Sequence, residues 1–551
     1  MKHRTLVVCT VLILAFGGTG AQERLQDYLA GLPFAMPAMA EPLFPDHRVN
    51  VASFGGHADG SALNTEAFAA AIRSCVAAGG GTVVVPAGTW LTGPIRLESN
   101  INLHLERGAL VQFSSRIEDF PLIAGFDGKS RKYLVAPPIH AYRATNIAIT
   151  GPGIIDGAGE VWRYVKKEKF PENRWKALVA SGGVVSPDGK QWWPSREALE
   201  GEAYLDRLEK EGKTATAADY AKTREYLRPD LVRLVQCDGI LIDGPTIRNS
   251  PKFHVHLVQS ENIIVRNATI ISDWWAQNGD GLDLAACRNV LVYNTTLDVG
   301  DDAICLKPSR IAERQKPGPA CENIVIAGCT VYHGHGGFVI GSETFGGARN
   351  VSVRNCTFVG TDVGIRLKSL RGKGGTVEKI FVDGVRMRGI QDEAILLDMF
   401  YGEEGSEAVA QPVSELTPRF SDISINDVVC LGAGRAVLVK GLPEMPANTV
   451  VIRNTRITAD EGALCINATG LMLSRCSITP VRGPVLTLRE SRDVTIEQTD
   501  VPPAAELFLR VEGERSRNIL LSGLNLQQAK KGIETGPGVP PGAVIPGGPE
   551  K

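Results

Sequence analysis

The chain has little charge of either sign and few aromatic residues. Of its 551 residues, 22% are charged, 6% are aromatic and 43% are hydrophobic, and the formal net charge is −2. A balance so close to zero excludes nucleic-acid binding that depends on bulk positive charge. The apolar content excludes a disordered chain. We therefore expect a globular protein with a large core and no nucleic-acid partner.

Long hydrophobic runs are also lacking. The run from Leu6 to Phe16 is shorter than the ~18 to 20 residues of a membrane-spanning helix. It follows Lys2 and Arg4 and precedes small residues up to Ala21, which is the pattern of a signal peptide over residues 1–21. We expect export to the periplasm or the extracellular space and no membrane span; a single-span anchor is the alternative. Without this segment 57 basic and 61 acidic residues remain, a net charge of −4.

Closely spaced cysteine ligands are absent as well. The mature chain would keep ten cysteines, several at strand-like positions, and none has the spacing of a metal site. Export would permit disulfides, whose pairing the sequence leaves open, but buried free thiols explain the positions equally well. We expect no metal and no cofactor.

Helical periodicity is scarce, and short β-branched segments recur instead. The segments NIIVRN, NVLVYN, NIVIAG, NVSVRN and KIFVDG begin at residues 262, 289, 323, 350 and 379, at intervals of 27, 34, 27 and 29 residues. A period near 30 in a chain with 60 glycines fits the stacked coils of a parallel β-helix. An antiparallel sandwich or propeller would need regular hairpin turns. We predict an all-β, right-handed parallel β-helix (solenoid) that forms a single catalytic domain over residues 22–535.

Three segments depart from this repeat. Asn64 or Thr65 begins an apolar-periodic helix that runs through Ala78, and such a helix can cap the end of a solenoid. Residues 158–230 form a partly helical insertion between coils, with tryptophans at 162, 175, 192 and 193. Residues 536–551 are rich in proline and glycine, which predicts a disordered tail.

Four polar clusters interrupt the apolar repeat. They are Asn278-Gly-Asp280-Gly-Leu-Asp283, Gly300-Asp301-Asp302, Gly334-His335-Gly336 and Arg366-Leu-Lys368. Their key residues are 22, 33 and 31 positions apart, about one coil each, so they should stack as one stripe on one face. Arg366 and Lys368 point to the same face of a strand, whereas Asp301 and Asp302 can do so only if Gly300 marks a bend or a strand end.

The stacked acids indicate acid–base chemistry. Carboxylates held close together raise one another's pKa, so one of the three should stay protonated. An acid beside a base or nucleophile is what glycoside hydrolysis requires. Taken singly, each aspartate could be a turn cap, His335 a turn histidine like those at 254, 256 and 333, and Arg366 and Lys368 solvated charges. As a set beside three acids, the two cations can balance charge or hold a substrate carboxylate.

In this order the clusters resemble the signature of glycoside hydrolase family 28, the polygalacturonases. The flanking sequences GHGGFVIGSE and GIRLKSLRGKGG are similar to those of bacterial members, and the resemblance runs from about residue 47 to 500. It implies that Asp301 is the general acid and that Asp280 and Asp302 activate the attacking water, with inversion at the anomeric carbon. It further implies that His335 tunes the acid or holds the geometry of the site. Gly279 stands where the family usually has threonine.

The resemblance also implies a substrate. Arg366 and Lys368 would bind a galacturonate carboxylate, and Arg371 and Lys373 would extend the positive surface. Tyr401 falls where the family often has a substrate-contacting tyrosine, and Asn278 would orient the site. The chain would be a secreted, monomeric polygalacturonase that degrades pectin of the plant cell wall. The insertion favours exo action if it blocks one end of the groove, and it is a packing insertion otherwise.

Other functions stay open at this point. A rhamnogalacturonan or xylogalacturonan hydrolase of the same family would share the chemistry but differ in its loops. A pectate lyase shares the solenoid, but its β-elimination usually needs Ca²⁺ held by several acids. A non-catalytic glycan-binding β-helix would use the stripe for recognition alone.

Overall fold

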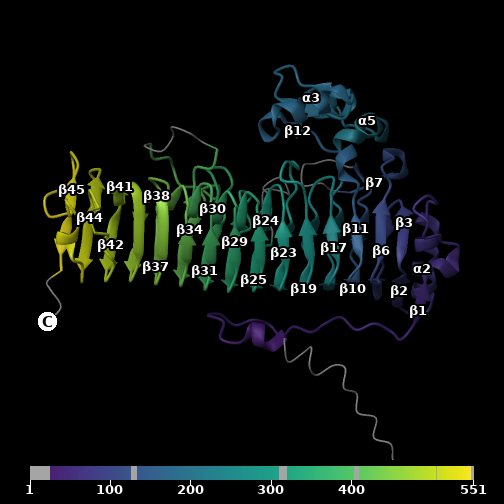
Figure 1. Cartoon of the computed structure of the whole chain (residues 1–551), viewed down its shortest axis with the longest axis horizontal. Helices are drawn as coiled ribbons and strands as arrows, with labels where there is room; N and C mark the ends of the chain where they lie inside the picture. Colours follow the sequence, from purple (N-terminus) through teal and green to yellow (C-terminus); the bar gives the residue numbers. More distant parts are fainter. Residues whose placement is uncertain (1–24, 126–132, 309–318, 403–408, 504, 548–551) are drawn as a thin grey trace, which may run out of the picture.

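The computed structural model describes residues 25–125, 133–308, 319–402, 409–503 and 505–547. The predicted signal peptide over residues 1–21 lies outside them. The described chain winds into a long stack of coils, and most coils contribute three strands that pair in parallel with the coils before and after (Figure 1). The predicted parallel β-helix is thus confirmed. None of the helices described is both long and apolar enough to cross a membrane.

One face of the stack is a 17-stranded sheet that contains the recurring segments seen in the sequence. Its strands are β1 (Arg48–Asn50), β2 (Gly81–Val85), β5 (Ile101–Leu105), β10 (Thr145–Thr150), β16 (Asp238–Asp243), β19 (Glu261–Arg266), β22 (Arg288–Tyr293), β25 (Cys321–Ala327), β28 (Ala348–Arg354), β31 (Thr376–Asp383), β34 (Arg419–Asn426), β37 (Ala447–Arg453), β39 (Ala468–Thr469), β40 (Met472–Ser474), β42 (Arg492–Glu497), β44 (Arg517–Ser522) and β46 (Val544–Pro546).

The second sheet has 24 strands and covers the other two faces. A series of mostly short strands comprises β3 (Gly88–Thr92), β6 (Ala109–Phe113), β11 (Ile154–Asp156), β17 (Thr246–Arg248), β20 (Thr269–Ile271), β23 (Thr296–Asp298), β26 (Thr330–Tyr332), β29 (Thr357–Val359), β32 (Arg386–Arg388) and β35 (Val429–Leu431). The third series comprises β4 (Ile95–Arg96), β9 (Ile139–Tyr142), β15 (Val232–Val235), β18 (Val255–Val258), β21 (Leu282–Ala285), β24 (Asp302–Lys307), β27 (Gly336–Ile340), β30 (Val363–Lys368), β33 (Glu393–Asp398) and β36 (Arg435–Lys440). The long strands β38 (Arg456–Ile466) and β41 (Ser477–Arg489) join the two series, and β43 (Leu509–Glu512) and β45 (Ile533–Thr535) follow.

Asparagines explain why the repeating segments begin as they do. Asn262, Asn289, Asn323 and Asn350 adopt left-handed backbone conformations, with φ of 55° or 56°. Asparagine tolerates this region better than most residues. Their side chains form a ladder from coil to coil, with Nδ2–Oδ1 distances of 3.0 to 3.2 Å. The ladder marks one corner of the coil and fixes the register of the apolar residues that follow.

The core is a set of stacked apolar rows. Ile263, Val290, Ile324, Val351 and Ile380 occupy equivalent positions in five successive coils, and each is fully buried. Burial of one such side chain stabilises the fold by about 1.5 to 3 kcal/mol. The ten described cysteines are all free and buried, which agrees with their reading as core residues.

The predicted capping helix is α2 (Thr65–Ala77), and Asn64 is its N-cap residue. Its buried face, which includes Phe68 and Ile72, packs on the first coils. The Asn64 side chain does not cap the helix. It donates instead to the carbonyls of His57, Ala62 and Leu91 and so ties the helix start to the first coil.

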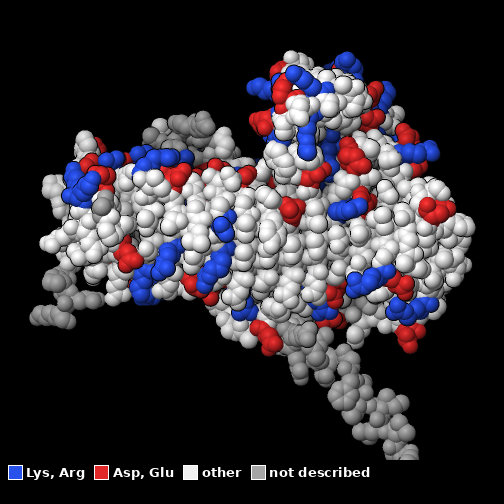
Figure 2. All heavy atoms as spheres, viewed as in Figure 1, with Lys and Arg blue, Asp and Glu red and all other residues white. Residues whose placement is uncertain are grey.

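The predicted insertion stands above the stack (Figure 1). It contains β12 (Val165–Lys166), α3 (Glu172–Ala180), β13 (Val184–Val185), β14 (Gln191–Trp193), α4 (Arg196–Lys210) and α5 (Ala217–Lys222). Charged side chains are dense on the insertion and sparser on the visible face of the coils (Figure 2). A small antiparallel pair, β7 (Leu122–Ala124) and β8 (Tyr133–Val135), contacts α5.

The N-terminal segment is a feature that the repeat analysis missed. Residues 25–44 run along the outside of the stack (Figure 1) and cover a stripe of outward-facing apolar residues on the 17-stranded sheet, including Ile264, Leu291 and Val325. Tyr28 stacks on Tyr293 at 4.2 Å between ring centroids. The segment therefore buries a surface that the bare solenoid would expose.

The prediction of a disordered tail over residues 536–551 is wrong for the part described. Val544–Pro546 form β46, which pairs in parallel with β44, and Val539 and Val544 pack on the core. The physical reason is that the last full coil leaves a strand edge with unpaired backbone groups, and a short strand covers it. Residues 548–551 lie outside the described part.

Candidate active site

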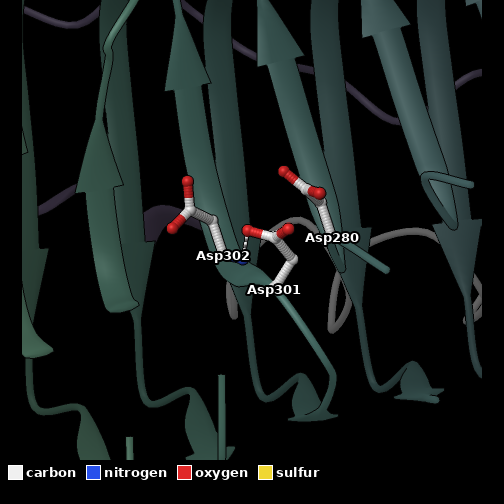
Figure 3. A group of neighbouring side chains, drawn as sticks. All are labelled: Asp280, Asp301 and Asp302. Atoms are coloured by element: carbon white, nitrogen blue, oxygen red, sulfur yellow. Dashed lines mark hydrogen bonds between the residues drawn. The ribbon is translucent and has the colours of Figure 1, made fainter. Parts of the chain in front are cut away.

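Three aspartates from two successive coils meet on the third series of strands (Figure 3). Asp280 lies two residues before β21, Asp301 lies directly before β24, and Asp302 is the first residue of β24. One carboxylate oxygen from each lies within 4.8 Å of the others. Asp280 and Asp302 are only 2% and 1% exposed.

The bend expected at Gly300 is present, because β24 begins only at Asp302. A Cβ at position 300 would lie 2.6 Å from the carbonyl oxygen of Asp273, so a side chain there would collide with the preceding coil. Asp301 therefore leaves the strand alternation and turns toward Asp302, whose backbone N–H donates to Asp301 Oδ1 at 3.0 Å (Figure 3).

Three cations from two strands, β24 and β30, compensate the acids. Lys368 Nζ lies 2.8 Å from Asp302 Oδ2, and Arg366 Nη1 lies 3.5 Å from Asp302 Oδ1. Lys307, at the end of β24, lies 3.2 Å from Asp280 Oδ2 and 3.3 Å from Asp283 Oδ1. The sequence did not single out Lys307. By distance the three carboxylates could share a cation, but these side chains already supply positive charge, and we assign no metal to the cluster.

Burial and charge separate the acids electrostatically. Burial, reinforced by the nearby charge of Asp283, raises the pKa of Asp280 well above its ordinary value. Burial also raises the pKa of Asp283 to about 7, although Lys307 opposes the shift. Burial disfavours ionised Asp301 too, but the hydrogen bond from His335 and the nearby positive charges, including Lys307 and Lys368, together outweigh it and hold the Asp301 pKa well below its ordinary value. In the free site the proton therefore belongs to Asp280 and Asp283 rather than to Asp301.

His335 lies directly against Asp301. Its Nδ1 is 3.0 Å from Asp301 Oδ1, and its backbone N–H donates to the Asp301 carbonyl at 2.9 Å. Arg366 Nη1 in turn donates to the His335 carbonyl at 2.9 Å. The third and fourth sequence clusters are thus held to the second by direct bonds.

The insertion reaches this site from above. Lys169 Nζ lies 3.3 Å from the carbonyls of Trp274 and Gly300 and 3.3 Å from His335 Nε2. Arg228, which follows the insertion helices, donates to Asn278 Oδ1 at 2.9 Å, so Asn278 is held in place from outside its own coil.

The comparisons with known proteins agree with this arrangement. The family model described as "Glycosyl hydrolases family 28" matches residues 165–477, which include all four clusters. The chain belongs to glycosyl hydrolase family 28. It is therefore a glycoside hydrolase.

Several named proteins are similar to this family 28 enzyme in sequence or in structure. An exo-poly-alpha-D-galacturonosidase of Dickeya chrysanthemi is 28% identical over 404 residues, 71% of this chain and 64% of the relative, just under two thirds of its length. A probable polygalacturonase of Vitis vinifera is 27% identical over 462 residues, 80% of this chain and 82% of the relative. The solved exopolygalacturonase of Thermotoga maritima superposes with a TM-score of 0.66 at 28% identity, over 83% of this chain and 96% of that one.

Two more residues were named from the sequence, and the structure places Tyr401 beside the cations of the site but Arg371 in an ion pair with Glu444. The Tyr401 ring lies beneath both cations, 5.0 Å from Lys368 Nζ and 5.5 Å from the Arg366 guanidinium carbon. Arg371 makes a bidentate ion pair with Glu444 at 2.8 and 3.0 Å. Its side chain is only 10% exposed. Arg371 therefore does not extend an open cationic surface, as we had expected, because Glu444 binds its guanidinium group.

Several residues of the site escaped the sequence analysis. Lys307 ends β24 just as Lys368, which the sequence did single out, ends β30, and this shared position was a usable signal. Lys169 gave none, because no repeat relates the insertion to the coils. The other histidines keep structural partners: His254 Nδ1 lies 2.8 Å from the Asp280 carbonyl, His256 Nδ1 2.7 Å from Asp230, and His333 Nδ1 3.0 Å from Asp298. At Gly279 a Cβ would lie 3.0 Å from the Ala276 carbonyl, so the usual threonine would need a small shift.

Proposed function

We propose that this enzyme is an exo-acting polygalacturonase that hydrolyses α-linked galacturonic acid from pectic chains or oligosaccharides with inversion. The observation that carries the proposal is the meeting of three aspartates with Arg366 and Lys368 in one site. The names of the relatives from Dickeya chrysanthemi and Thermotoga maritima support both the substrate and the exo mode.

The reaction needs one proton donor and one proton acceptor. Asp301 gives its proton to the glycosidic oxygen as the bond from that oxygen to the anomeric carbon breaks. A water attacks the same carbon and passes a proton to Asp302, or to Asp280 when that carboxyl group is ionised. Asp280 Oδ1 is buried and accepts no hydrogen bond from the described residues, so it offers an acceptor for this water. Proton transfer of this kind contributes about 10²- to 10⁴-fold in rate.

The substrate's own charge helps to place the proton. Lys368 is among the cations that lower the Asp301 pKa. A galacturonate carboxylate bound by Arg366 and Lys368 offsets this positive charge, so the Asp301 pKa rises when substrate binds. Tyr401, beneath both cations, then lies where the sugar ring would pack. Binding thus converts Asp301 from an ionised group to a proton donor.

Inversion is proposed on the family resemblance and not on distance. Inverting glycosidases usually hold their two carboxyl groups about 6.5 to 9.5 Å apart, with water between them. Here the nearest oxygens of all three acids lie within 4.8 Å. An inverting attack still has to come from the face of the sugar opposite the leaving oxygen, so the leaving oxygen would lie toward Asp301 and the water toward Asp280 and Asp302.

Exo action is supported by the insertion. Lys169 contacts the Gly300 carbonyl and His335, and the ring of the adjacent Phe170 packs against Trp275 with 5.1 Å between ring centroids, so part of the insertion stands directly beside the site. A wall there leaves room for a chain end but obstructs a chain that passes through. We further propose that the enzyme is a monomer, exported through its N-terminal leader, that acts on plant cell-wall pectin in the periplasm or outside the cell.

The proposal is tested by product analysis over time on polygalacturonic acid, with wild type beside Asp301→Asn. We expect early release of monomer alone by wild type, with the β-anomer first in ¹H NMR, and none by the variant. The α-anomer first would refute inversion, and early mixed oligomers would refute exo action. Unsaturated product that absorbs in the ultraviolet would identify a lyase. No release would refute the polygalacturonan assignment and direct testing to rhamnogalacturonan and xylogalacturonan fragments.

A further inference from the structure

Lys169 is a residue of the insertion that contacts His335 and the Gly300 carbonyl, directly beside Asp301. It ends the short 3-10 turn Lys167–Lys169, and its side chain is half-buried. An ammonium group has three N–H donors and no acceptor. Three acceptors surround it at 3.3 Å each: the carbonyls of Trp274 and Gly300, and His335 Nε2. All three protons of Lys169 are therefore used.

This contact decides which nitrogen of His335 carries the proton. Because Lys169 can only donate, His335 Nε2 must present a lone pair to it. The imidazole proton then lies on Nδ1, which is 3.0 Å from Asp301 Oδ1 and donates to it. In a histidine the bond made by one ring nitrogen sets the state of the other.

We propose that Lys169 is a positioning residue that holds His335 neutral, with its proton on Nδ1. Asp301 then receives a hydrogen bond from an uncharged ring instead of a contact with an imidazolium. The proposal rests on the proposed roles of Asp301 and His335 in catalysis, and it adds a residue outside the coils to that machinery.

The groups that face His335 show what Lys169 prevents. Asp301 lies on the Nδ1 side, and Asp362 Oδ2 lies 3.8 Å from Nε2, just beyond a hydrogen bond. Arg366 contacts the His335 carbonyl, and the charge of Asp392 also reaches His335. Without Lys169, Nε2 would take a proton and pair with Asp362. An imidazolium in direct contact with Asp301 would stabilise the ionised carboxylate and make it a weaker acid.

The first test measures the tautomer itself and needs no substrate. Selective ¹⁵N labelling of histidine, with the His335 signals assigned by their loss in His335→Gln, reports the state of both ring nitrogens. We expect the wild type to show Nδ1 protonated and Nε2 unprotonated at about pH 6, close to the ordinary histidine pKa. In Lys169→Met we expect Nε2 to be protonated as well. A wild-type His335 that is doubly protonated, or protonated on Nε2 alone, would overturn the proposal.

The second test separates positioning from substrate binding. We expect Lys169→Met to lower kcat on oligogalacturonate by about tenfold or more and to change KM by less than about threefold. Asp362→Asn added to Lys169→Met removes the partner of the new Nε2–H and should restore part of the kcat. Lys167→Met is the matched control, since Lys167 lies on the same turn and its contact is with Glu172 at 3.7 Å.

The outcomes of the two proposals can be told apart. A raised KM with unchanged kcat in Lys169→Met would mean that Lys169 binds substrate and would overturn the positioning role. Inactive wild type on every galacturonate substrate would refute the proposed function, while the histidine spectrum would still decide the role of Lys169.

Discussion

Lys307→Met tests whether a buried cation keeps the acids of the site ionisable. The Lys307 side chain is 14% exposed and lies 3.2 and 3.3 Å from Asp280 and Asp283, whose side chains are 3% and 0% exposed. Methionine keeps most of the apolar stem and removes only the charge. In this variant the buried carboxyl groups of Asp280 and Asp283 lose the lysine that contacts both of them.

The expected cost follows from this geometry. Breaking a buried ion pair by removing one partner costs about 3 to 5 kcal/mol, because the remaining charge is left uncompensated. Unfolding entropy is about 2.1 cal/mol/K per residue, or about 1.2 kcal/mol/K for this chain, so Tm should fall by about 3 to 4 °C. The loss of stability falls on the coils that contribute Asp280, Asp283 and Lys307, since each coil of a solenoid contacts only its neighbours.

The loss should depend on pH, and its sign can be worked out. Burial already raises the pKa of Asp283 to about 7 and that of Asp280 well above its ordinary value, and removing Lys307 raises both further. Between the unfolded pKa of about 3.9 and these folded values, the folded state binds more protons than the unfolded state. Stability then falls as pH rises, so the defect is larger at neutral pH than at acidic pH.

Differential scanning calorimetry at about pH 4.5 and pH 7.5 measures this difference, since the two values lie on either side of most of the titration. The control is Lys213→Met, whose pair with Glu211 is 2.8 Å long but exposed, and such surface pairs contribute about 1 kcal/mol or less. Lys307→Met melting like wild type at neutral pH, or a defect that does not shrink in acid, would refute the reasoning.

Two further variants probe the proposed chemistry. Asp301→Asn removes the donated proton but keeps the shape, so kcat should fall by about 10²- to 10⁴-fold with little change in KM; a fall below tenfold in steady-state assays would remove Asp301 from the role of acid. Arg366→Met should raise KM for oligogalacturonate by about tenfold or more, because a charge-assisted bond to a carboxylate is worth about 1.5 to 3 kcal/mol; equal KM values for charged and reduced, neutral substrate analogues in wild type would contradict this.

Much of the fold could be predicted because its residues repeat. Asparagines in the left-handed region and apolar rows recur once per coil, so intervals in the sequence became stacked neighbours in space. The same logic placed Asp280, Asp302, His335 and Arg366 together. It worked because the first three clusters lie where the chain enters the third series of strands, in matching register from coil to coil, and the fourth lies further along the next strand, β30.

What the repeat does not relate could not be predicted. The N-terminal segment of residues 25–44 covers an apolar stripe of the 17-stranded sheet, but it has no periodicity of its own. The composition of the tail predicts disorder, but it does not show that the tail meets the open edge of β44, where Val544–Pro546 pair as a strand. Arg371 matched a motif, yet only the structure shows that Glu444, from a coil further along the chain, holds its guanidinium.

Because Asp301 lies just before β24 and Asp302 begins it, both side chains can face the site, which two neighbouring residues within a regular strand cannot do. Neighbouring side chains in a strand point to opposite faces, so Asp301 and Asp302 could not both face the site within β24. The bend at Gly300 frees Asp301 from this alternation, and the backbone N–H of Asp302 then binds its carboxylate. The coils fix the acids by their own geometry, whereas the state of His335 depends on a lysine from the insertion. A change in the insertion can therefore alter the chemistry of the site without moving a single aspartate.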